Sequence, residues 1–125
     1  MNLLLETHVF LWWLDDPLLL KDVARIEIAN PRNAVYVSAV CVQEIVLKQA
    51  RNRLTCPEPI LPQIGANRFT PLPITPDRAQ AMRDLLPLHK DPFDRQLVAQ
   101  SRVEGLNPVT RDEKLAEYGV PVLRA

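Results

Sequence analysis

Short apolar runs that alternate with helical segments are the feature of this sequence that most constrains its fold. Strands buried on both faces read as continuous apolar runs. Strands separated by helices form right-handed βαβ units around a mostly parallel sheet. The sequence therefore predicts an α/β fold in which helices cover both faces of that sheet. The expected strands span residues 2–5, 34–37, 69–74, 106–110 and 120–123.

Capping residues and apolar spacing place the helices between these strands. Thr7, Ser38, Thr75 and Asp91 are expected N-caps, because their side-chain oxygens can accept hydrogen bonds from free backbone N–H groups. Gly105 is the expected C-terminal stop of the helix that Asp91 begins. Prolines within 69–74 confine that strand to an edge of the sheet. The expected helices span residues 9–14, 18–30, 38–51, 60–67, 75–86, 91–104 and 113–118.

Composition limits the classes of function. A chain of 125 residues with 47% apolar residues can form one domain with a single core, and we expect that domain to span residues 1–125. The formal net charge is zero, so nucleic-acid binding would need a local cationic patch or a metal. No signal peptide or membrane span is evident, which predicts a cytoplasmic protein without a membrane partner.

Four acids fall where a parallel sheet would bring them together. Glu6 and Asp112 follow strands, Asp94 lies in the first turn of a helix, and Glu44 lies within the helix after the second strand. Ligands of such sheets bind beyond the carboxyl ends of the strands. Clustered carboxylates repel one another, and an Mg²⁺ or Mn²⁺ ion would offset the repulsion. Such an ion can activate water for phosphodiester hydrolysis.

Spacing alone leaves a structural explanation open. Fifteen acids will place some at strand ends by chance, and the helix dipole mildly favours an acid such as Asp94 in a first turn. Competing chemistry has less support. The three glycines are isolated and form no phosphate loop, no serine lies in a nucleophile elbow, and His8 and His89 lack the spacing of a zinc motif.

Recognisable sequence blocks cover essentially the whole chain, and the most specific are Asp-Pro-Phe-Asp-Arg and Thr-Arg-Asp. The blocks are Met1 to Leu5 with Thr7 and His8, 11–14, 37–39 leading to Glu44, 89–95, 109–112 and 118–123. Together they resemble the PIN-domain family, and within it the VapC-type toxins of type II toxin–antitoxin systems.

The resemblance implies a three-layer α/β/α domain and an endoribonuclease that depends on Mg²⁺ or Mn²⁺. It also implies a cognate antitoxin protein that blocks the site, an RNA substrate and a homodimer. Asp94 and Asp112 match acidic metal ligands, Glu44 matches the helix acid, and Glu6 takes the place of the acid after the first strand. These four are the expected catalytic and metal-binding residues. Thr110 is expected to assist with its hydroxyl, and Asp91 is a motif position interpreted mainly as a cap.

Cations near the acidic edge are candidates for RNA binding. Lys90, Arg95 and Arg111 are the first choices, with Arg51 and Arg53 beside them. An ordinary solvated charge, or an ion pair with a neighbouring acid, is the alternative for each.

Glu6 departs from the family pattern, in which an aspartate stands at this position. The extra methylene displaces the carboxylate by roughly 1 Å, and a misplacement of that size can cost about 100-fold in rate. The alternative function is therefore a weakly active or inactive PIN-fold module that binds an antitoxin. A different phosphoryl-transfer enzyme is disfavoured, because Glu6-Thr7-His8 stands where an Asp-x-Asp motif would follow the first strand.

Overall fold

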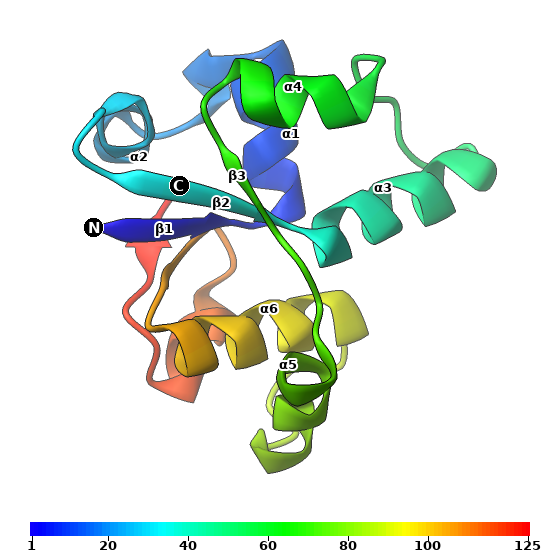
Figure 1. Cartoon of the computed structure of the whole chain (residues 1–125), viewed down its shortest axis with the longest axis vertical. Coiled ribbons are helices and arrows are strands. Elements are labelled where there is room, and N and C mark those ends of the chain that lie inside the picture. Colours follow the sequence, from blue (N-terminus) through cyan, green and yellow to red (C-terminus); the bar gives the residue numbers. More distant parts are fainter.

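A five-stranded parallel sheet with β1 at its centre organises the chain. The computed structural model describes residues 1–125, and the strand order is β3-β2-β1-β4-β5 with every neighbouring pair parallel (Figure 1). The predicted parallel sheet is confirmed, and so is the edge position of the proline-containing strand. The strands are β1 (Asn2–Leu5), β2 (Ala34–Ser38), β3 (Thr70–Leu72), β4 (Asn107–Thr110) and β5 (Leu123–Arg124).

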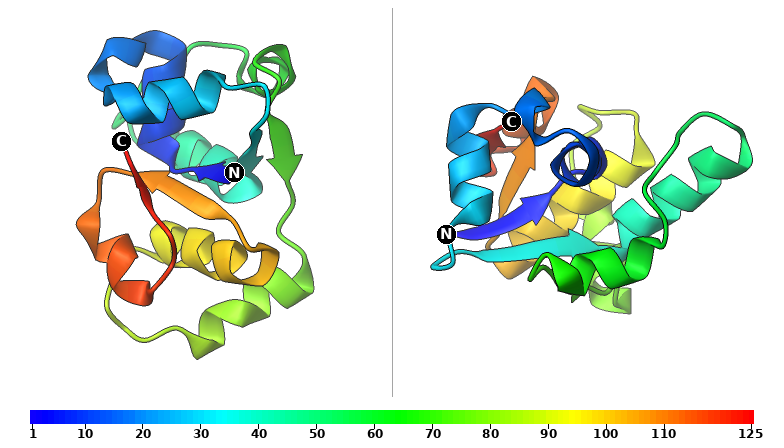
Figure 2. Two further views of the ribbon diagram at one scale, coloured as in Figure 1. Left: turned by 90° about the vertical axis from the view of Figure 1, so that its left-hand side faces the viewer. Right: turned by 90° about the horizontal axis from the view of Figure 1, so that it is seen from above.

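Helices cover both faces of the sheet, which confirms the predicted three-layer α/β/α arrangement. Helices α1 (Thr7–Asp15), α2 (Asp22–Ala29) and α4 (Ile60–Ala66) lie on one side, and α5 (Pro76–Gln80) and α6 (Pro92–Glu104) lie on the other (Figures 1 and 2). Helix α3 (Ala39–Ala50) continues directly from β2 at the carboxyl edge of the sheet. Short 3₁₀ helices span Pro17–Leu19, Ala81–Asp84 and Glu113–Tyr118.

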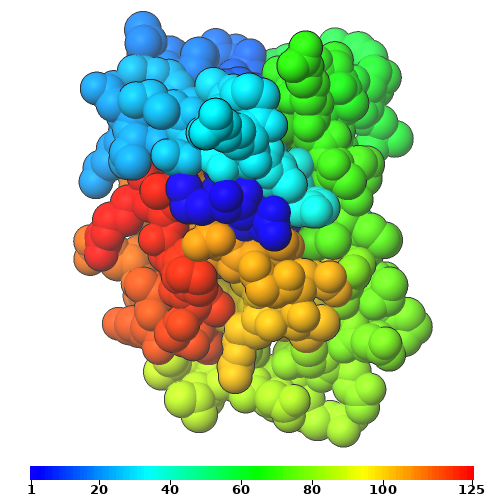
Figure 3. Space-filling view, turned by 60° about the vertical axis from the view of Figure 1, so that its left-hand side comes forward, coloured from blue at the N-terminus to red at the C-terminus, as the bar shows by residue number.

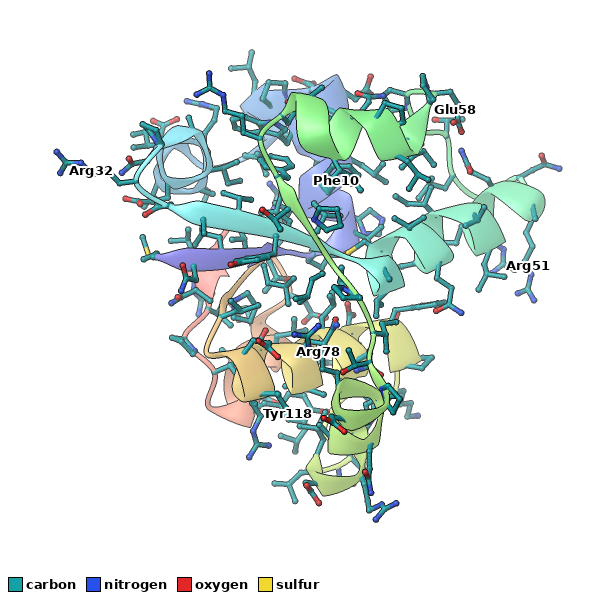
Figure 4. All side chains as sticks on the ribbon, in the orientation of Figure 1. Phe10, Arg32, Arg51, Glu58, Arg78 and Tyr118 are labelled. Atoms are coloured by element: carbon teal, nitrogen blue, oxygen red, sulfur yellow. The ribbon has the colours of Figure 1, made fainter.

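The central strand is fully enclosed. Leu3, Leu4 and Leu5 are at most 1% exposed, because β1 lies between β2 and β4 with a helical layer on each face. Figure 3 shows the amino end of β1 between the segment that leads into β2 and the β4–β5 region. Phe10 of α1 points into this core (Figure 4) and meets Phe69 edge to face, with ring centroids 6.3 Å apart.

Predicted caps hold several helix ends. The Ser38 hydroxyl oxygen accepts from the Val40 N–H at 3.0 Å, and the Thr75 hydroxyl oxygen accepts from the Arg78 N–H at 3.4 Å. Asp91 Oδ1 accepts from the Phe93 N–H at 2.8 Å, with Pro92 at the first helical position. Gly105 ends α6 with φ of 67°, a left-handed conformation that glycine adopts without a steric penalty. The helix boundaries at these residues are therefore set locally.

One predicted cap is wrong. Thr7 does not cap α1. Glu6 does, by accepting the His8 N–H at 3.1 Å. The Thr7 hydroxyl is instead buried and donates to the carboxylate of Glu44. The long-range partner therefore prevails over the local one.

Several predicted elements are shorter than expected. The strand expected at 69–74 covers only Thr70–Leu72. The helix expected at 18–30 begins only at Asp22, because Pro17–Leu19 form a separate 3₁₀ turn and Leu20 then turns inward in an extended conformation. The helix expected at 75–86 ends at Gln80 and continues as a 3₁₀ turn. The last strand is only Leu123–Arg124, since Val120 packs in a side cluster with Leu115 and Pro121 has no N–H for the ladder.

No helix in the structure has both the length and the apolar character needed to cross a bilayer.

Replacement of Leu4 by alanine tests the role of the central strand. We expect Leu4→Ala to lower the free energy of unfolding by about 2–5 kcal/mol, because it leaves a cavity in an enclosed core. Leu18→Ala is the matched control, since Leu18 is 79% exposed and its loss should cost under about 0.5 kcal/mol. Urea denaturation of both variants measures the difference. Equal effects would contradict this description of the core.

Candidate metal centre at the carboxyl edge of the sheet

The predicted acids do approach one edge of the sheet. Glu6 directly follows β1, Asp112 lies two residues beyond β4, and Asp94 is in the first turn of α6. Glu44 comes from α3, which packs against both α1 and α6 at this edge (Figure 1). The negative charges of Glu6, Glu44 and Asp91 all act on Asp94. The strand order explains the gathering, because β1 and β4 are neighbours and end side by side.

Three side chains form a compact group of potential metal ligands. One atom each of His89, Asp94 and Asp112 lies within 4.8 Å of the other two. His89 Nε2 is 2.7 Å from Asp112 Oδ2 and 3.2 Å from Asp94 Oδ2. The imidazole therefore links the two acids that the sequence singled out as metal ligands.

Backbone contacts fix the orientation of His89. Its Nδ1 accepts the Asp91 N–H at 3.0 Å, which places the ring proton on Nε2, facing Asp94 and Asp112. Its own N–H donates to the Tyr118 hydroxyl at 2.9 Å. Sequence reasoning missed this role because it tested histidines only for zinc spacing. The available signal was the position of His89 two residues before the Asp91 cap.

Asp94 is the acid of the cluster whose charged form is most disfavoured by its surroundings. Burial, followed by the charges of Asp91, Glu6 and Glu44, raises its pKa to about 7, against a partial opposing effect of His89. Its side chain is 14% exposed, so water screens these charges weakly. Capping alone does not explain an acid in this environment, whereas a bound cation would relieve the repulsion.

Asp112 is held differently. Burial raises its pKa, but the Lys114 N–H and His89 outweigh burial and the net pKa is lowered. Its Oδ1 accepts the Lys114 N–H at 2.9 Å, so it caps the 3₁₀ helix that follows. The Thr110 hydroxyl oxygen accepts the Asp112 N–H at 3.0 Å. Thr110 thus orients the backbone of Asp112, and both oxygens of that carboxylate have intramolecular partners.

Glu44 is the most buried of the four acids, at 3% exposed. The Thr7 hydroxyl donates to its Oε1 at 2.6 Å, and Lys48 Nζ donates to its Oε2 at 2.5 Å. Proximity to Glu44 raises the pKa of Lys48, since the carboxylate favours the charged amine. Both oxygens of Glu44 therefore have protein partners, which the sequence did not predict.

Glu6 also has local partners. Its Oε1 accepts the His8 N–H at 3.1 Å and lies 3.2 Å from His8 Nδ1. Hydrogen bonding to Glu6 raises the pKa of His8, partly opposed by burial. The longer side chain of glutamate thus turns back onto the start of α1 as its N-cap.

Two of the three cations expected to bind RNA have intramolecular partners. Arg95 donates to the Leu86 carbonyl at 3.0 Å and to the Tyr118 hydroxyl at 3.3 Å. The Arg111 guanidinium lies over the Trp12 ring, 4.2 Å from its centroid, and donates to the carbonyls of Leu19 and Ala125. Neither arginine pairs with a neighbouring acid. Lys90 is exposed and makes no hydrogen bond or ion pair.

The donor set fits a hard divalent cation. Carboxylate oxygens dominate it, and such oxygens suit Mg²⁺ and Mn²⁺ better than zinc, which favours sulfur and nitrogen. Asp94 and Asp112 are the residues that would hold the ion, with Glu6 and Glu44 contributing negative charge. As arranged, His89 presents an N–H donor between the two aspartates and not a ligand lone pair. The His89 N–H therefore lies where a cation bound by the two aspartates would lie.

Comparison with known proteins agrees with this fold. The PIN domain family model matches residues 3–121. A chain from the crystal structure of VapBC2 from Rickettsia felis bound to a promoter DNA fragment superposes with a TM-score of 0.67 at 12% identity, covering 100% of this chain and 98% of that one. A chain of FitAB bound to the IR36 DNA fragment gives 0.63 at 19% identity, covering 98% and 94%. A search of curated proteins found no match.

The chain belongs to the PIN domain family, because the family model spans nearly all of it. The resemblance seen in the sequence is thereby confirmed. Membership supports the nuclease class predicted for this chain and, with the cluster at the sheet edge, the use of a divalent metal. At their low identities the two solved structures show the shared fold.

Replacement of Asp94 by asparagine tests the electrostatics of the cluster. The raised pKa means that the folded protein keeps a proton between about pH 4 and 7 that the unfolded chain has lost, so this group lowers stability as pH rises through that window. Asp94→Asn should therefore be more stable than the parent at pH 8 in EDTA, by on the order of 1–3 kcal/mol, with a smaller difference at pH 5.

Urea denaturation at both pH values measures this change, with Asp84→Asn as control. Asp84 is exposed and lies beside Arg102 and Val103, near the other end of α6. Parallel pH profiles for the parent and Asp94→Asn would contradict the assigned repulsion.

Proposed function

We propose that this protein is the toxin of a type II toxin–antitoxin system, acting as an Mg²⁺- or Mn²⁺-dependent endoribonuclease in the cytoplasm. Family membership and the place of the acids at the carboxyl edge support this function. The single observation that carries it is the group of His89, Asp94 and Asp112 within 4.8 Å, in surroundings that raise the pKa of Asp94 to about 7. A protein that only needed helix caps would not bring so much negative charge together.

The chemistry follows from the acids. Asp94 and Asp112, with Glu6 and Glu44 nearby, would hold one or two ions, and such an ion supplies Lewis acidity for the attack of water on a phosphodiester. Asp94 and Asp112 would each be ionised when the ion is bound. Thr110 and Lys114 keep the backbone around Asp112 in place. The His89 N–H would have to turn away from the two carboxylates.

RNA steering falls to exposed cations around this edge. Lys90, next to the cluster, has no intramolecular partner, and Arg51 projects into solvent from the end of α3 (Figure 4). Arg53 lies two residues further on. Arg95 and Arg111 would contribute positive charge from fixed positions, because their guanidiniums are already hydrogen-bonded within the chain.

Protein partners are part of the proposal. The two similar structures are of the assemblies VapBC2 and FitAB, each bound to DNA. A groove of about 900 Å³ lies between α3, α4 and β3, with mostly apolar walls. Exposed apolar surface of this kind often marks a protein interface. It supports partnership with an antitoxin and formation of a homodimer. Its walls include Val42, Val46, Leu61, Ile64, Pro71 and Leu72.

A second candidate function has its own observation. Glu6 caps α1, and both oxygens of Glu44 are hydrogen-bonded to Thr7 and Lys48. If these contacts persist, two of the four acids contribute only charge, and the chain would be a weakly active or inactive PIN-fold module that binds an antitoxin. The length of Glu6 is the feature that favours this reading.

Cleavage of RNA with and without metal tests the principal proposal. We expect the parent to cut single-stranded RNA only when Mg²⁺ or Mn²⁺ is present. Asp94→Asn and Asp112→Asn should each lower the cleavage rate by at least 100-fold while the far-ultraviolet circular dichroism stays native. Asp84→Asn should cut like the parent. Retained cleavage in a folded Asp94→Asn protein would overturn the assignment of the site.

Shortening Glu6 separates the two candidate functions. Glu6→Asp restores the acid that the family carries at this position, and it should raise kcat by about 10- to 100-fold if carboxylate placement limits the parent. The same time courses of RNA cleavage measure this ratio. Equal rates for both proteins would show that the longer acid is tolerated. Cleavage by Glu6→Asp alone would favour the binding-module function for the natural chain.

A further inference from the structure

A small pocket beside the metal centre has no role in the function proposed above. It has a volume of about 260 Å³ and lies between α1 and the loop at 53–57. The rings of His8 and Trp12 form part of its wall, and Asp15, Arg53 and Thr55 supply its polar groups. Drug-sized ligands occupy about 300–1,000 Å³, so this pocket suits a smaller planar group.

Its polar side chains are free. Asp15, Arg53 and Thr55 make no side-chain hydrogen bond or ion pair within the chain, unlike Arg78 and Arg124, which pair with glutamates. The three offer an acceptor, a donor and a hydroxyl that can do both. A planar ligand with donors and acceptors on its edge would satisfy them.

The aromatic wall is oriented and partly backed. The His8 and Trp12 rings have centroids 5.9 Å apart at an interplanar angle of 44°. Arg111 lies over the Trp12 ring but does not line the pocket, whereas Trp12 does. Arg111 thus holds the indole in place from outside the pocket.

The pocket adjoins the proposed reaction centre. His8 lines the pocket and its Nδ1 is 3.2 Å from Glu6 Oε1. A group held by Trp12 and Arg53 would therefore lie close enough to Glu6 to belong to the same RNA strand as a phosphate held at the carboxylates. Nucleic-acid bases have planar faces with donors and acceptors on their edges, and proteins bind unpaired bases by stacking and edge hydrogen bonds.

We propose that this pocket binds one unpaired nucleobase of the RNA strand that is cleaved at the neighbouring carboxylates. The inference rests on the proposed nuclease function and deepens it, because it assigns a base-binding site next to the carboxylates. A base in a duplex cannot reach a pocket unless it leaves the stack. A protein partner fits the apolar groove beside α3 better than this small pocket of mixed polarity.

Tryptophan fluorescence tests the proposal without depending on cleavage. The Trp13→Phe variant leaves Trp12 as the only tryptophan, and stacking of a base on Trp12 should quench its emission. The probes are a pool of RNA octamers with random sequence and an octamer of abasic ribose phosphates with the same charge. Titration is carried out with Mg²⁺ in protein that also carries Asp94→Asn, which should slow cleavage by at least 100-fold, and a gel afterwards checks that the RNA is intact.

We expect the RNA pool to quench Trp12 and the abasic octamer to bind about 10- to 100-fold more weakly, as the loss of base stacking predicts. In the same background, Arg53→Ala and Thr55→Phe should each reduce the quenching. Arg32→Ala removes the same charge at the distant amino edge (Figure 4) and should leave the titration unchanged.

Two results would overturn the proposal. One is equal binding of the RNA pool and the abasic octamer, and the other is binding of RNA, seen by anisotropy, with no change in Trp12 emission. Absence of any RNA binding would overturn it as well. Quenching that depends on Arg53 in a protein without nuclease activity would retain the pocket and refute only the proposed catalysis.

Discussion

Helix N-caps at the carboxyl edge of the parallel sheet are the interaction on which the site depends. Glu6 caps α1, Asp91 caps α6, and Asp112 caps the 3₁₀ helix after β4. A helix N-terminus attracts negative charge, so the fold itself stabilises acids at this edge. Because β1 and β4 are neighbours, the caps that follow them lie at the same edge of the sheet. Contacts that stabilise each helix locally therefore also bring negative charges together.

Donor groups of the chain itself contact the clustered carboxylates. Lys48 neutralises Glu44, and the His89 N–H lies between Asp94 and Asp112. These contacts supply hydrogen-bond donors to the carboxylates when no ion is bound. Asp94 remains under repulsion, with its pKa raised to about 7. The cost to stability at neutral pH is consistent with an acid retained for function.

Sequence alone predicted the parallel sheet, its three layers and the acids at its edge, because apolar runs and caps such as Ser38 and Asp91 are local signals. It could not predict contacts that depend on tertiary packing. Thr7 has a local capping role available, yet it donates to Glu44 across 37 residues of sequence. His89 is hydrogen-bonded to Asp112 across 23 residues of sequence, and the guanidinium of Arg111 stacks on the Trp12 ring. In each case a tertiary contact gives the side chain a partner that local sequence patterns do not predict.

Calorimetric titration with Mn²⁺ at pH 7.5 tests the central claim most directly, because it asks whether the clustered acids bind a cation. We expect Mn²⁺ to bind the natural protein, to bind Asp94→Asn and Asp112→Asn at least tenfold more weakly, and to bind Asp84→Asn as it binds the natural protein. If the natural protein does not bind Mn²⁺, or if all four proteins bind it alike, the acids at this edge are helix caps and do not form a metal centre.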